Sequence, residues 1–561
     1  MAVGIRPSGP AHSVHHTSHK HHNAIIHFHK ALALERFGGV FMMERIKKHI
    51  HMNRRKGSVT AQITLDDDFN VPDTMDDVED LILESGEVQI ESARNQGEKV
   101  AVKGKLAFRV LYRTPGGQVM TLAGNLPFDE VINMPGLGPD DHVRVGWELD
   151  DLHVGIINSR KLDVKALVTL MLQGEAIETI TAAGDVRFDG QVETLKREID
   201  VAELAVRRKD TFRVKEVLTL PGNKPDIDKL LWQDMKLRGV STKPLDGRIR
   251  LEGELMVFAV YAGEDSQMPV QCLEESVPFS GDVELSEADE DMIPFITVKL
   301  VHKSMDVNPD SDGEMREISV DAVLELDIRL YEENEVEILS DLYALDREIL
   351  PDMGEACFDQ IAMRNMVKHK IQEKVVLSGG QRILQICHGD GNVKIDDVQI
   401  VENGLRVDGV LEAQILYLTA EDASPVAAHT EMIPFQVEAE VPGIRTDSVY
   451  QIEPGLEQFS AVMLGGDTVE MKAVVTMDIF VLNPVCEQVI LGIREEPLDM
   501  EKLKKMPGIV GYIVQPGDSL WKIARNFHTS VEEIMETNER NDSIIRPGEK
   551  LILVKMIRER Q

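Results

Sequence analysis

Alternation of apolar and polar residues dominates the chain from Val59 to about Asp499. Its clearest example is a segment of 13 residues that occurs three times, as VAVKGKLAFRVLY (100–112), IRLEGELMVFAVY (249–261) and LRVDGVLEAQILY (405–417). In each copy the central glycine, the final tyrosine and most of the apolar residues share one parity. A period of two over this length predicts a β-strand with one buried face.

The three copies of this strand share a glycine near their middle, at Gly104, Gly253 and Gly409. A glycine inside a strand gives up a packing side chain. It therefore marks a bulge, a bend or a close approach of the backbone to a neighbour. The pattern by itself leaves these three alternatives open.

A second strand recurs downstream, as RKLDVKALVTLML (160–172), REISVDAVLELDIRL (316–330) and DTVEMKAVVTMDIFV (467–481). Its shared alanine follows the shared glycine by 62, 69 and 64 residues, and a Pro-Phe pair lies between them each time. Matching order and spacing predict a tandem repeat of domains of about 150 residues rather than a solenoid. Turns rich in Gly, Pro and Asp separate the strands, which favours β-sandwiches.

A chain of 561 residues is too long for one hydrophobic core. We therefore divide it into three β-sandwich-like repeats, at 59–200, 201–350 and 351–500, and a small domain at 507–561. The fold class is mainly β. Within the third repeat, Glu355–Gln372 has the character of a helix, and we expect a helical lead-in that bridges the second and third repeats.

The hydrophobic period changes at the C-terminal end of the chain. A short strand, Tyr512–Gln515, is followed by apolar residues with the period of a helix, at Leu520, Ile523, Ala524 and Phe527. The sequence Ser530-x-x-Glu533 then predicts a capping box at the start of a second helix. A closing strand over Lys550–Val554 completes a βααβ unit.

These residues resemble a LysM module. The resemblance rests on Gly517-Asp518-Ser519-Leu520, on Ile523-Ala524 with Phe527, on Asn538 and on Pro547-Gly548 with Leu551. It implies a shallow groove between the turn Gly517–Leu520 and the loop Asn541–Ile545, which in the family holds N-acetylglucosamine polymers. The groove residues implied are Gly517, Asp518, Ser519, Leu520, Asn541, Asp542, Ser543, Ile544 and Ile545.

The three repeats resemble the SPOCS domain of endospore-forming bacteria. The resemblance rests on Val71-Pro72-Asp73-Thr74 in the first copy and on Leu220-Pro221 with Pro225-Asp226-Ile227 in the second, together with the shared strands. The third copy departs from this opening, because Leu377-Ser378-Gly379-Gly380 replaces the proline and aspartate. Three such domains followed by one LysM module are the layout of the SipL-like spore coat morphogenetic proteins.

This family resemblance implies a structural protein without catalytic residues. We expect an elongated acidic scaffold with the LysM module as a docking head at its end. It would act in the mother-cell cytoplasm, at the forespore surface, and contact the coat ATPase known as stage IV sporulation protein A. The alternative is a protein that binds the N-acetylglucosamine chains of peptidoglycan or cortex. A wall hydrolase is a third hypothesis, and it would need a polar site in one repeat that the others lack.

The first 58 residues form a distinct segment that holds 10 of the 17 histidines. Several neutral imidazoles within reach of one another can bind nickel or zinc. Our main hypothesis is a disordered His-rich and basic extension, or a start assigned too far upstream, because Met42-Met43 makes a more natural beginning. The apolar stretch near Ala31–Met43 is interrupted by Glu35 and Arg36, so we predict no signal peptide.

The chain has a net charge of −36, and the excess of acidic residues lies between this basic extension and the C-terminal module. Because phosphate groups repel an acidic surface, we expect neither nucleic acid nor anionic lipid as a partner. No apolar run is long enough to predict a transmembrane segment. Four widely spaced cysteines favour a reducing compartment and argue against a disulfide framework.

Two stretches imitate the chemistry of functional sites. Asn308-x-Asp310-x-Asp312-Gly313 resembles the start of a calcium loop, but Ser319 occupies the position that needs a bidentate glutamate. The neighbours Cys387 and His388 could be taken for a nucleophile and its base, but adjacent residues rarely face each other. We therefore predict no catalytic residue, no metal site and no cofactor.

Overall fold

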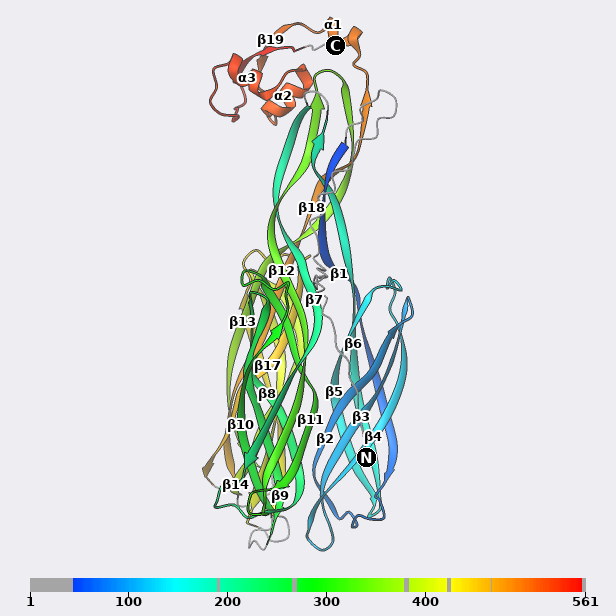
Figure 1. Cartoon of the computed structure of the whole chain (residues 1–561), viewed down its shortest axis with the longest axis vertical. Coiled ribbons are helices and arrows are strands. Elements are labelled where there is room, and N and C mark those ends of the chain that lie inside the picture. Colours follow the sequence, from blue (N-terminus) through cyan, green and yellow to red (C-terminus); the bar gives the residue numbers. More distant parts are fainter. Residues whose placement is uncertain are drawn as a thin grey trace, which may run out of the picture.

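Three β-sandwich domains, a stalk and a small α/β module make up the computed structural model (Figure 1). The structure describes residues 44–188, 192–264, 270–377, 383–420, 425–465 and 467–556. The histidine run between His12 and His22 lies outside these residues. The three sandwiches contact one another at one end of the long axis, where the second and third overlap in the view of Figure 1, and the stalk carries the C-terminal module at the other end.

Each sandwich consists of two antiparallel three-stranded sheets. In the first domain one sheet has the order β1-β6-β5 and the other β2-β3-β4. The strand bounds are Glu44–Asn70 (β1), Asp80–Asn95 (β2), Lys99–Arg113 (β3), Val119–Asn133 (β4), His142–Asn158 (β5) and Lys161–Arg187 (β6). The shared sequence strands are β3 and β6, which form the centre of their sheets.

The other two domains repeat this topology, with sheets β11-β12-β7 and β10-β9-β8, then β13-β18-β17 and β14-β15-β16. The second domain consists of Val192–Thr219 (β7), Ile227–Leu245 (β8), Arg248–Gly263 (β9), Val270–Glu284 (β10), Ile293–Pro309 (β11) and Met315–Ala344 (β12). The third consists of Glu348–Val376 (β13), Ile383–Val401 (β14), Gly404–Thr419 (β15), Val426–Glu440 (β16), Val449–Gly465 (β17) and Thr468–Glu496 (β18). The predicted fold class is confirmed.

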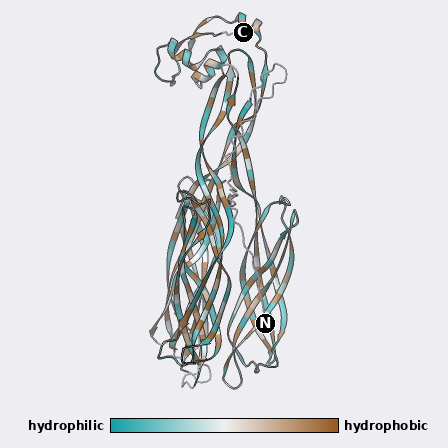
Figure 2. Ribbon diagram, viewed as in Figure 1, coloured by the Kyte–Doolittle hydropathy of each residue, from teal (hydrophilic) through white to brown (hydrophobic). Residues whose placement is uncertain are grey.

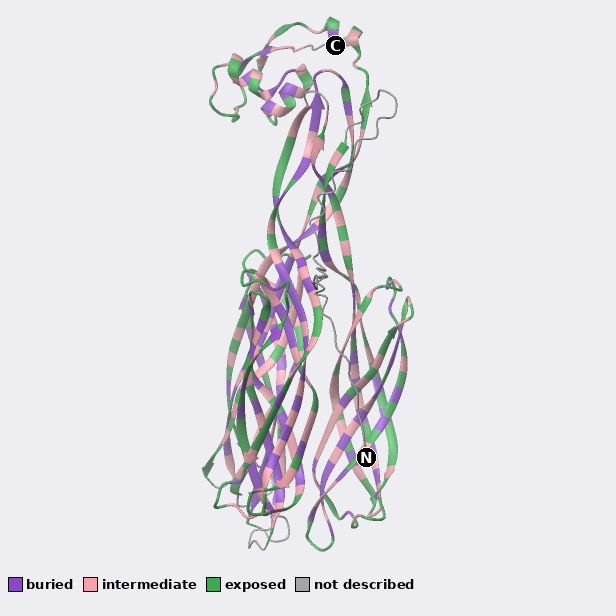
Figure 3. Ribbon diagram, in the orientation of Figure 1, coloured by how far each residue is buried: buried purple, intermediate pink, exposed green. Residues whose placement is uncertain are grey.

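The sandwich cores follow from the period-two pattern. Along β6, the alternate residues Leu162, Val164, Ala166, Val168 and Leu170 are at most 3% exposed. Hydropathy alternates along the strands in Figure 2, and burial alternates with it in Figure 3. Burying one large apolar side chain contributes about 1.5–3 kcal/mol, so these rows stabilise each domain.

The shared glycine marks a close approach. Gly104, Gly253 and Gly409 lie directly opposite the phenylalanine of the recurring Pro-Phe pair on the next strand, at Phe128, Phe279 and Phe435. A Cβ atom on these glycines would lie 2.6–2.8 Å from the Cζ atom of that ring. A register shift follows on the strand to the other side. Each glycine therefore lies between a phenylalanine ring on one neighbouring strand and a β-bulge on the other.

An arginine holds the proline-aspartate turn of the first two domains in place. Arg160 donates to the backbone oxygens of Val71, Pro72 and Met75 at 2.6–3.1 Å. Arg316 in the second domain likewise donates to Pro221 at 2.9 Å. This contact explains why the turn and the start of the second shared strand recur together.

The stalk consists of three two-stranded arms, one from each domain. Each arm begins at a register shift where the sandwich ends: residues 44–55 pair with 175–187, 192–204 with 331–344 and 348–361 with 482–496. The arms share a buried core, composed of Ile50, Met52, Ala182, Ile199, Val201, Val336, Ile338, Phe358 and Val489. No arm could bury these residues alone, so the three domains depend on one another.

Two sequence expectations fail in the stalk. Residues 44–58, which we assigned to the disordered extension, form the first half of β1. The expected helix Glu355–Gln372 is wrong, because this segment lies inside β13 and pairs with β18 along its length. Pairing with a distant strand and burial of Phe358 among the other arms outweigh its local preference for helix. The strands also begin each domain before the boundaries that we predicted, at Glu44, Val192 and Glu348.

The sheets β2-β3-β4, β8-β9-β10 and β14-β15-β16 also meet one another. Strand β4 contacts β8, β10 contacts β14, and β16 contacts β2, so the three domains close a ring. A buried cluster at its centre contains Leu111, Trp232, Phe258 and Leu416. We expected one elongated scaffold, and its length comes from the stalk rather than from domains joined end to end.

Ion pairs join the domains between these two apolar clusters. Arg54 of the first domain lies 2.7 Å from Asp359 of the third, and Arg207 of the second lies 2.8 Å from Glu175 of the first. Arg329 is 1% exposed and also contacts Glu175, at 3.2 Å. Since Glu175, Arg329 and Asp359 are buried and each has a partner from another domain, separating the domains would leave charges uncompensated.

The cysteines pair in space although they are far apart in sequence. Cys357 on β13 lies opposite Cys486 on β18, and the two form a disulfide. The wide spacing of the cysteines in the sequence had argued against disulfides, and this bond corrects that expectation. The sequence could not show it, because the two cysteines become neighbours only when β13 pairs with β18.

Candidate functional site

The C-terminal module folds around a core that its own residues mostly supply and that Tyr343 and Leu345 of the stalk join. It consists of β19 (Ile509–Ile513), α2 (Leu520–Phe527), α3 (Val531–Thr537) and β20 (Lys550–Val554), and α1 (Met500–Lys505) precedes it. The two strands pair antiparallel. Core residues at most 2% exposed are Val514, Leu520, Ile523, Ala524, Ile534, Leu551 and Leu553. The predicted βααβ order is confirmed.

Serine caps begin both helices of the module. The Ser519 hydroxyl accepts a hydrogen bond from the Lys522 amide at 3.2 Å. The Ser530 hydroxyl accepts one from the Glu533 amide at 3.1 Å, as one half of the predicted capping box requires. These caps define where each helix starts, and hence the position of the loops between them.

The module docks on the stalk through one face of α2. Asp341 of β12 accepts a hydrogen bond from Nε1 of Trp521 at 2.8 Å and pairs with Arg525 at 2.8 Å. The hydroxyl of Tyr343 donates to the backbone oxygen of Thr529 at 2.9 Å, and its ring meets Trp521 edge-on at 4.8 Å. Trp521 and Arg525 are one helical turn apart, so a single face of α2 makes the contact.

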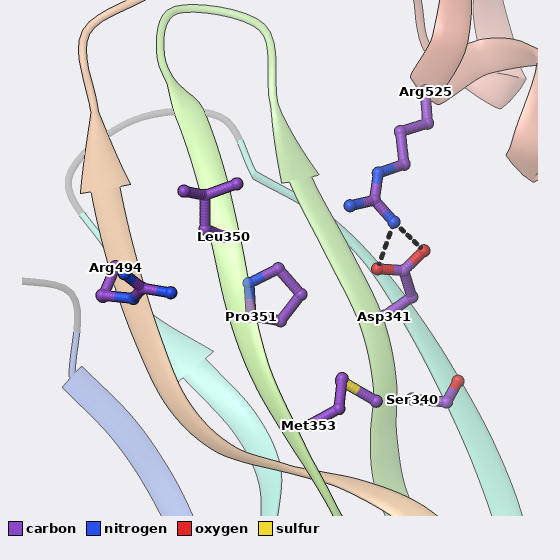
Figure 4. A pocket seen from close by; sticks show the side chains of 7 residues that line it. All are labelled: Ser340, Asp341, Leu350, Pro351, Met353, Arg494 and Arg525. Carbon is purple, nitrogen blue, oxygen red and sulfur yellow. Dashed lines mark hydrogen bonds and ion pairs between the residues drawn. The ribbon is translucent and has the colours of Figure 1, made fainter.

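A hollow of about 540 Å³ lies beside this contact (Figure 4). Its lining residues are Ser340, Asp341, Leu350, Pro351, Met353, Arg494 and Arg525. Arg525 is the one contribution of the module, and Figure 4 shows its guanidinium directed at Asp341 rather than into the hollow. The hollow therefore belongs to the stalk tip and does not coincide with the predicted groove.

The first predicted groove segment has structural roles. Gly517 has a φ of 86°, in the left-handed region that favours glycine. The Asp518 carboxylate accepts hydrogen bonds from the Gln515 amide and the Tyr512 hydroxyl, both at 2.7 Å, and these two contacts lower its pKa. Ser519 caps α2, and Leu520 is buried in the core. This segment shapes the turn, and mainly Gly517 is exposed.

The second predicted groove segment is open to solvent. Asn541, Asp542, Ser543 and Ile544 are exposed, and 71% of Ile544 is accessible. Ile545 is half-buried and packs against the module core. An exposed isoleucine among small polar side chains offers both apolar contact and hydrogen bonds to a ligand.

Two residues outside the predicted set shape this loop. Arg540 donates to the backbone oxygen of Ile544 and pairs with Glu549 at 2.7 Å. Asn538 bridges α3 and β20, donating to Ile534 and Ile552 at 2.8 Å and accepting from the Ile552 amide at 2.7 Å. The sequence offered a signal only for Asn538, as a position of the LysM motif.

The remaining sequence candidates have structural roles. Asp310 accepts hydrogen bonds from the amides of Asp312 and Glu314, at 2.9 and 3.0 Å, and so closes a turn rather than a calcium loop. Within the part of the chain that the structure describes, no group of three or more His, Cys, Asp or Glu could hold a metal ion. No helix of the described residues is long and apolar enough to cross a membrane.

Three repeated sandwiches and a docked βααβ module define a modular binding protein. Family models identify these parts: the SipL SPOCS domain matches residues 77–157, 226–308 and 382–464, and the LysM domain matches 512–554. The chain belongs to the SPOCS-domain proteins that carry a C-terminal LysM domain, and it is a sporulation-related protein. Both are non-catalytic binding domains. No curated protein and no solved structure matches the chain.

The SPOCS matches and the structural domains have different limits. The first match ends inside β5 and the second inside β11, and neither includes the long strands that form the arms. The matched segments thus leave out the first and last strand of each domain, both the part inside the sandwich and the part in the arm.

Proposed function

We propose that the chain is a non-enzymatic scaffold in endospore coat assembly that links the coat basement layer to the forespore surface. The LysM domain makes the link by binding a coat ATPase like stage IV sporulation protein A. The site of action is the mother-cell cytoplasm, at the forespore surface. The family matches support the setting, and the acidic body is consistent with a partner other than nucleic acid or anionic lipid.

One observation carries this proposal. The LysM domain is fixed on the stalk tip by Asp341 and Tyr343, while the loop Asn541–Ile544 remains exposed. A fixed orientation reduces the entropy that a partner must remove on binding. The stalk therefore acts as a rigid spacer that presents the loop at a distance from the sandwich domains.

Two variants of equally exposed isoleucines test the proposal. Ile544→Asp alters the loop, and Ile509→Asp alters β19, where 69% of Ile509 is accessible. The full chain and both variants are used to recover the ATPase from sporulating cells. We expect Ile544→Asp to lose most of the recovered ATPase and Ile509→Asp to retain it. Equal recovery by both variants would contradict the assignment of the loop.

The second candidate is binding of N-acetylglucosamine polymers, which the LysM match itself favours. Titration of the full chain with N-acetylglucosamine oligomers and with purified peptidoglycan separates the two functions. Saturable binding that Ile544→Asp abolishes would favour the glycan. No binding by the folded chain, together with recovery of the ATPase, would favour the protein partner.

A further inference from the structure

The junction between the second and third SPOCS domains holds the two free cysteines of the described residues, Cys272 and Cys387. Cys272 lies on β10 and Cys387 on β14, and their exposed fractions are 6% and 7%. Both belong to the buried cluster at the centre of the ring, where β10 contacts β14. Nε2 of Gln385 also lies 3.6 Å from Sγ of Cys272. Two thiols from different domains thus meet in a buried site.

A β-bulge directs Cys387 toward the neighbouring domain. The ladder of β14 on β15 passes from Ile386 to His388, so Cys387 has no partner in it. The same shift occurs around Ile82 in β2 and Leu231 in β8. A bulged residue leaves the ladder and is re-aimed, and in each domain it reaches the next sandwich in the ring.

The three junctions are equivalent, but only one pairs cysteines. At the first, the Thr121 hydroxyl of β4 donates to the backbone oxygen of Leu231. At the third, Ala428 of β16 and Ile82 both pack on the central cluster. These junctions close with ordinary side chains, so packing does not require two cysteines at the second.

We propose that Cys272 and Cys387 form a reversible disulfide that joins the second SPOCS domain to the third when the chain meets a low-molecular-weight disulfide. The Cys272 thiolate attacks one sulfur of that disulfide and releases one small thiol. Cys387 then loses its proton to solvent and attacks the sulfur of Cys272, which releases the second small thiol. Two protein thiols are oxidised, and one disulfide is reduced to two thiols.

The surroundings identify Cys272 as the attacking sulfur. The hydrogen bond from Cys387 lowers the pKa of Cys272 and outweighs burial, and the positive charge of Lys224 acts in the same direction. The same contact, together with burial, raises the pKa of Cys387. The thiolate is the nucleophile in thiol–disulfide exchange, so Cys272 reacts first.

His388 takes no part as a base. Its ring stacks on Phe258 at a centroid distance of 4.0 Å, and its Nδ1 atom lies 2.8 Å from the Glu274 carboxylate. The pair of neighbours that resembled a nucleophile and base in the sequence therefore faces two different partners.

Oxidation of the full chain with oxidised glutathione tests the proposal. After quenching, the chain is denatured, alkylated and digested, and disulfide-linked peptides are identified by mass spectrometry. We expect a Cys272–Cys387 linkage that dithiothreitol reverses. We also expect the melting temperature to rise by several degrees, because the cross-link lowers the conformational entropy of the unfolded chain. The same linkage in a Cys357→Ser/Cys486→Ser variant would show that it does not depend on the existing disulfide.

A matched control variant gives the second junction the side chains that occupy the same positions at the third junction. Cys272→Ala/Cys387→Ile reproduces the pair Ala428 and Ile82, so it should fold without the link. Oxidised glutathione should then leave its melting temperature unchanged. Recovery of Cys272 and Cys387 as free thiols, or of each as a mixed disulfide with glutathione, would overturn the proposal.

Discussion

The carboxylate of Asp341 accepts a hydrogen bond of 2.8 Å from the indole nitrogen of Trp521, and this contact ties the stalk to the LysM domain. The two residues lie in different domains and in different kinds of element. The same carboxylate also pairs with Arg525, so one side chain at the stalk tip holds one face of α2.

Asp341→Asn should release the LysM domain from the stalk without unfolding it, because the module keeps its own core. Loss of the charged partner should cost about 1–3 kcal/mol of docking free energy. We expect faster proteolysis between β18 and β19 and a red shift of Trp521 fluorescence. Asp66→Asn, at an exposed position of β1, is the control. Proteolysis equal to that of the control would contradict the docking role of Asp341.

Gly253→Ala should destabilise the second domain by about 1–3 kcal/mol, the usual cost of an overpacked site. The added Cβ would lie 2.8 Å from Cζ of Phe279. Thermal or urea unfolding measures the loss. Gly222→Ala is the control, since its Cβ would meet no atom within 4 Å. The double variant Gly253→Ala/Phe279→Leu should recover part of the stability, and no recovery would mean that the ring is not the cause.

In the Asp234→Asn variant the free energy of unfolding should depend less on pH in the acid range. Burial by itself raises the pKa of Asp234, but the charges of Lys236 and Lys303 outweigh it and lower the pKa to about 2. Because this pKa is depressed below the usual 3.8 of an aspartate, the ionised carboxylate stabilises the fold above that value. The stabilisation is lost as the pH falls through about 2.

At pH 7 the Asp234→Asn variant should therefore be less stable than the natural chain by about 2 kcal/mol. Urea unfolding between pH 7 and pH 2 measures the difference, which should shrink below about pH 4 and vanish near pH 2. Asp66→Asn again serves as the control. A difference that stays constant across this range would show that the ionised carboxylate does not stabilise the fold.

Arg540→Ala should loosen the Asn541–Ile544 loop while the LysM core stays folded. Arg540 holds the backbone oxygen of Ile544 and pairs with Glu549. Amide hydrogen exchange in the loop should rise on the order of tenfold, as the loss of about one hydrogen bond predicts. The control is Arg546→Ala, at an exposed position of the same loop region. Similar exchange in both variants would mean that Arg540 does not order the loop.

The sequence predicted the two recurring strands of each domain and the four elements of the LysM domain, because their burial repeats within a few residues. Alternate residues of β6 had to face one core, and a turn of α2 had to bury Leu520, Ile523 and Ala524. The Pro-Phe pairs and the shared glycines were both visible as recurring residues. Their contact across neighbouring strands emerged only when the register was known.

The predicted groove residues likewise fall into two groups, those with structural roles and those exposed to solvent. The LysM motif identified the module, but most of Gly517–Leu520 owes its pattern to the turn, the helix cap and the core. The exposed loop was predicted as a segment, without Arg540, which orders it. Motif residues in a small domain serve structure and binding alike, and contacts are needed to separate the two.

Local pattern thus determined the three repeats, the buried faces of their two recurring strands and the LysM domain, because those faces show as apolar residues at regular spacing. Only the tertiary structure decided the stalk, the ring of domains and the docking of the LysM domain. Residues 44–55 and 348–361 belong to two-stranded arms with few fully buried side chains, and so they lack a strong apolar period. Their few buried residues, such as Ile50 and Phe358, are covered by arms from distant parts of the chain. Such burial depends on contacts that are absent from any local stretch of sequence.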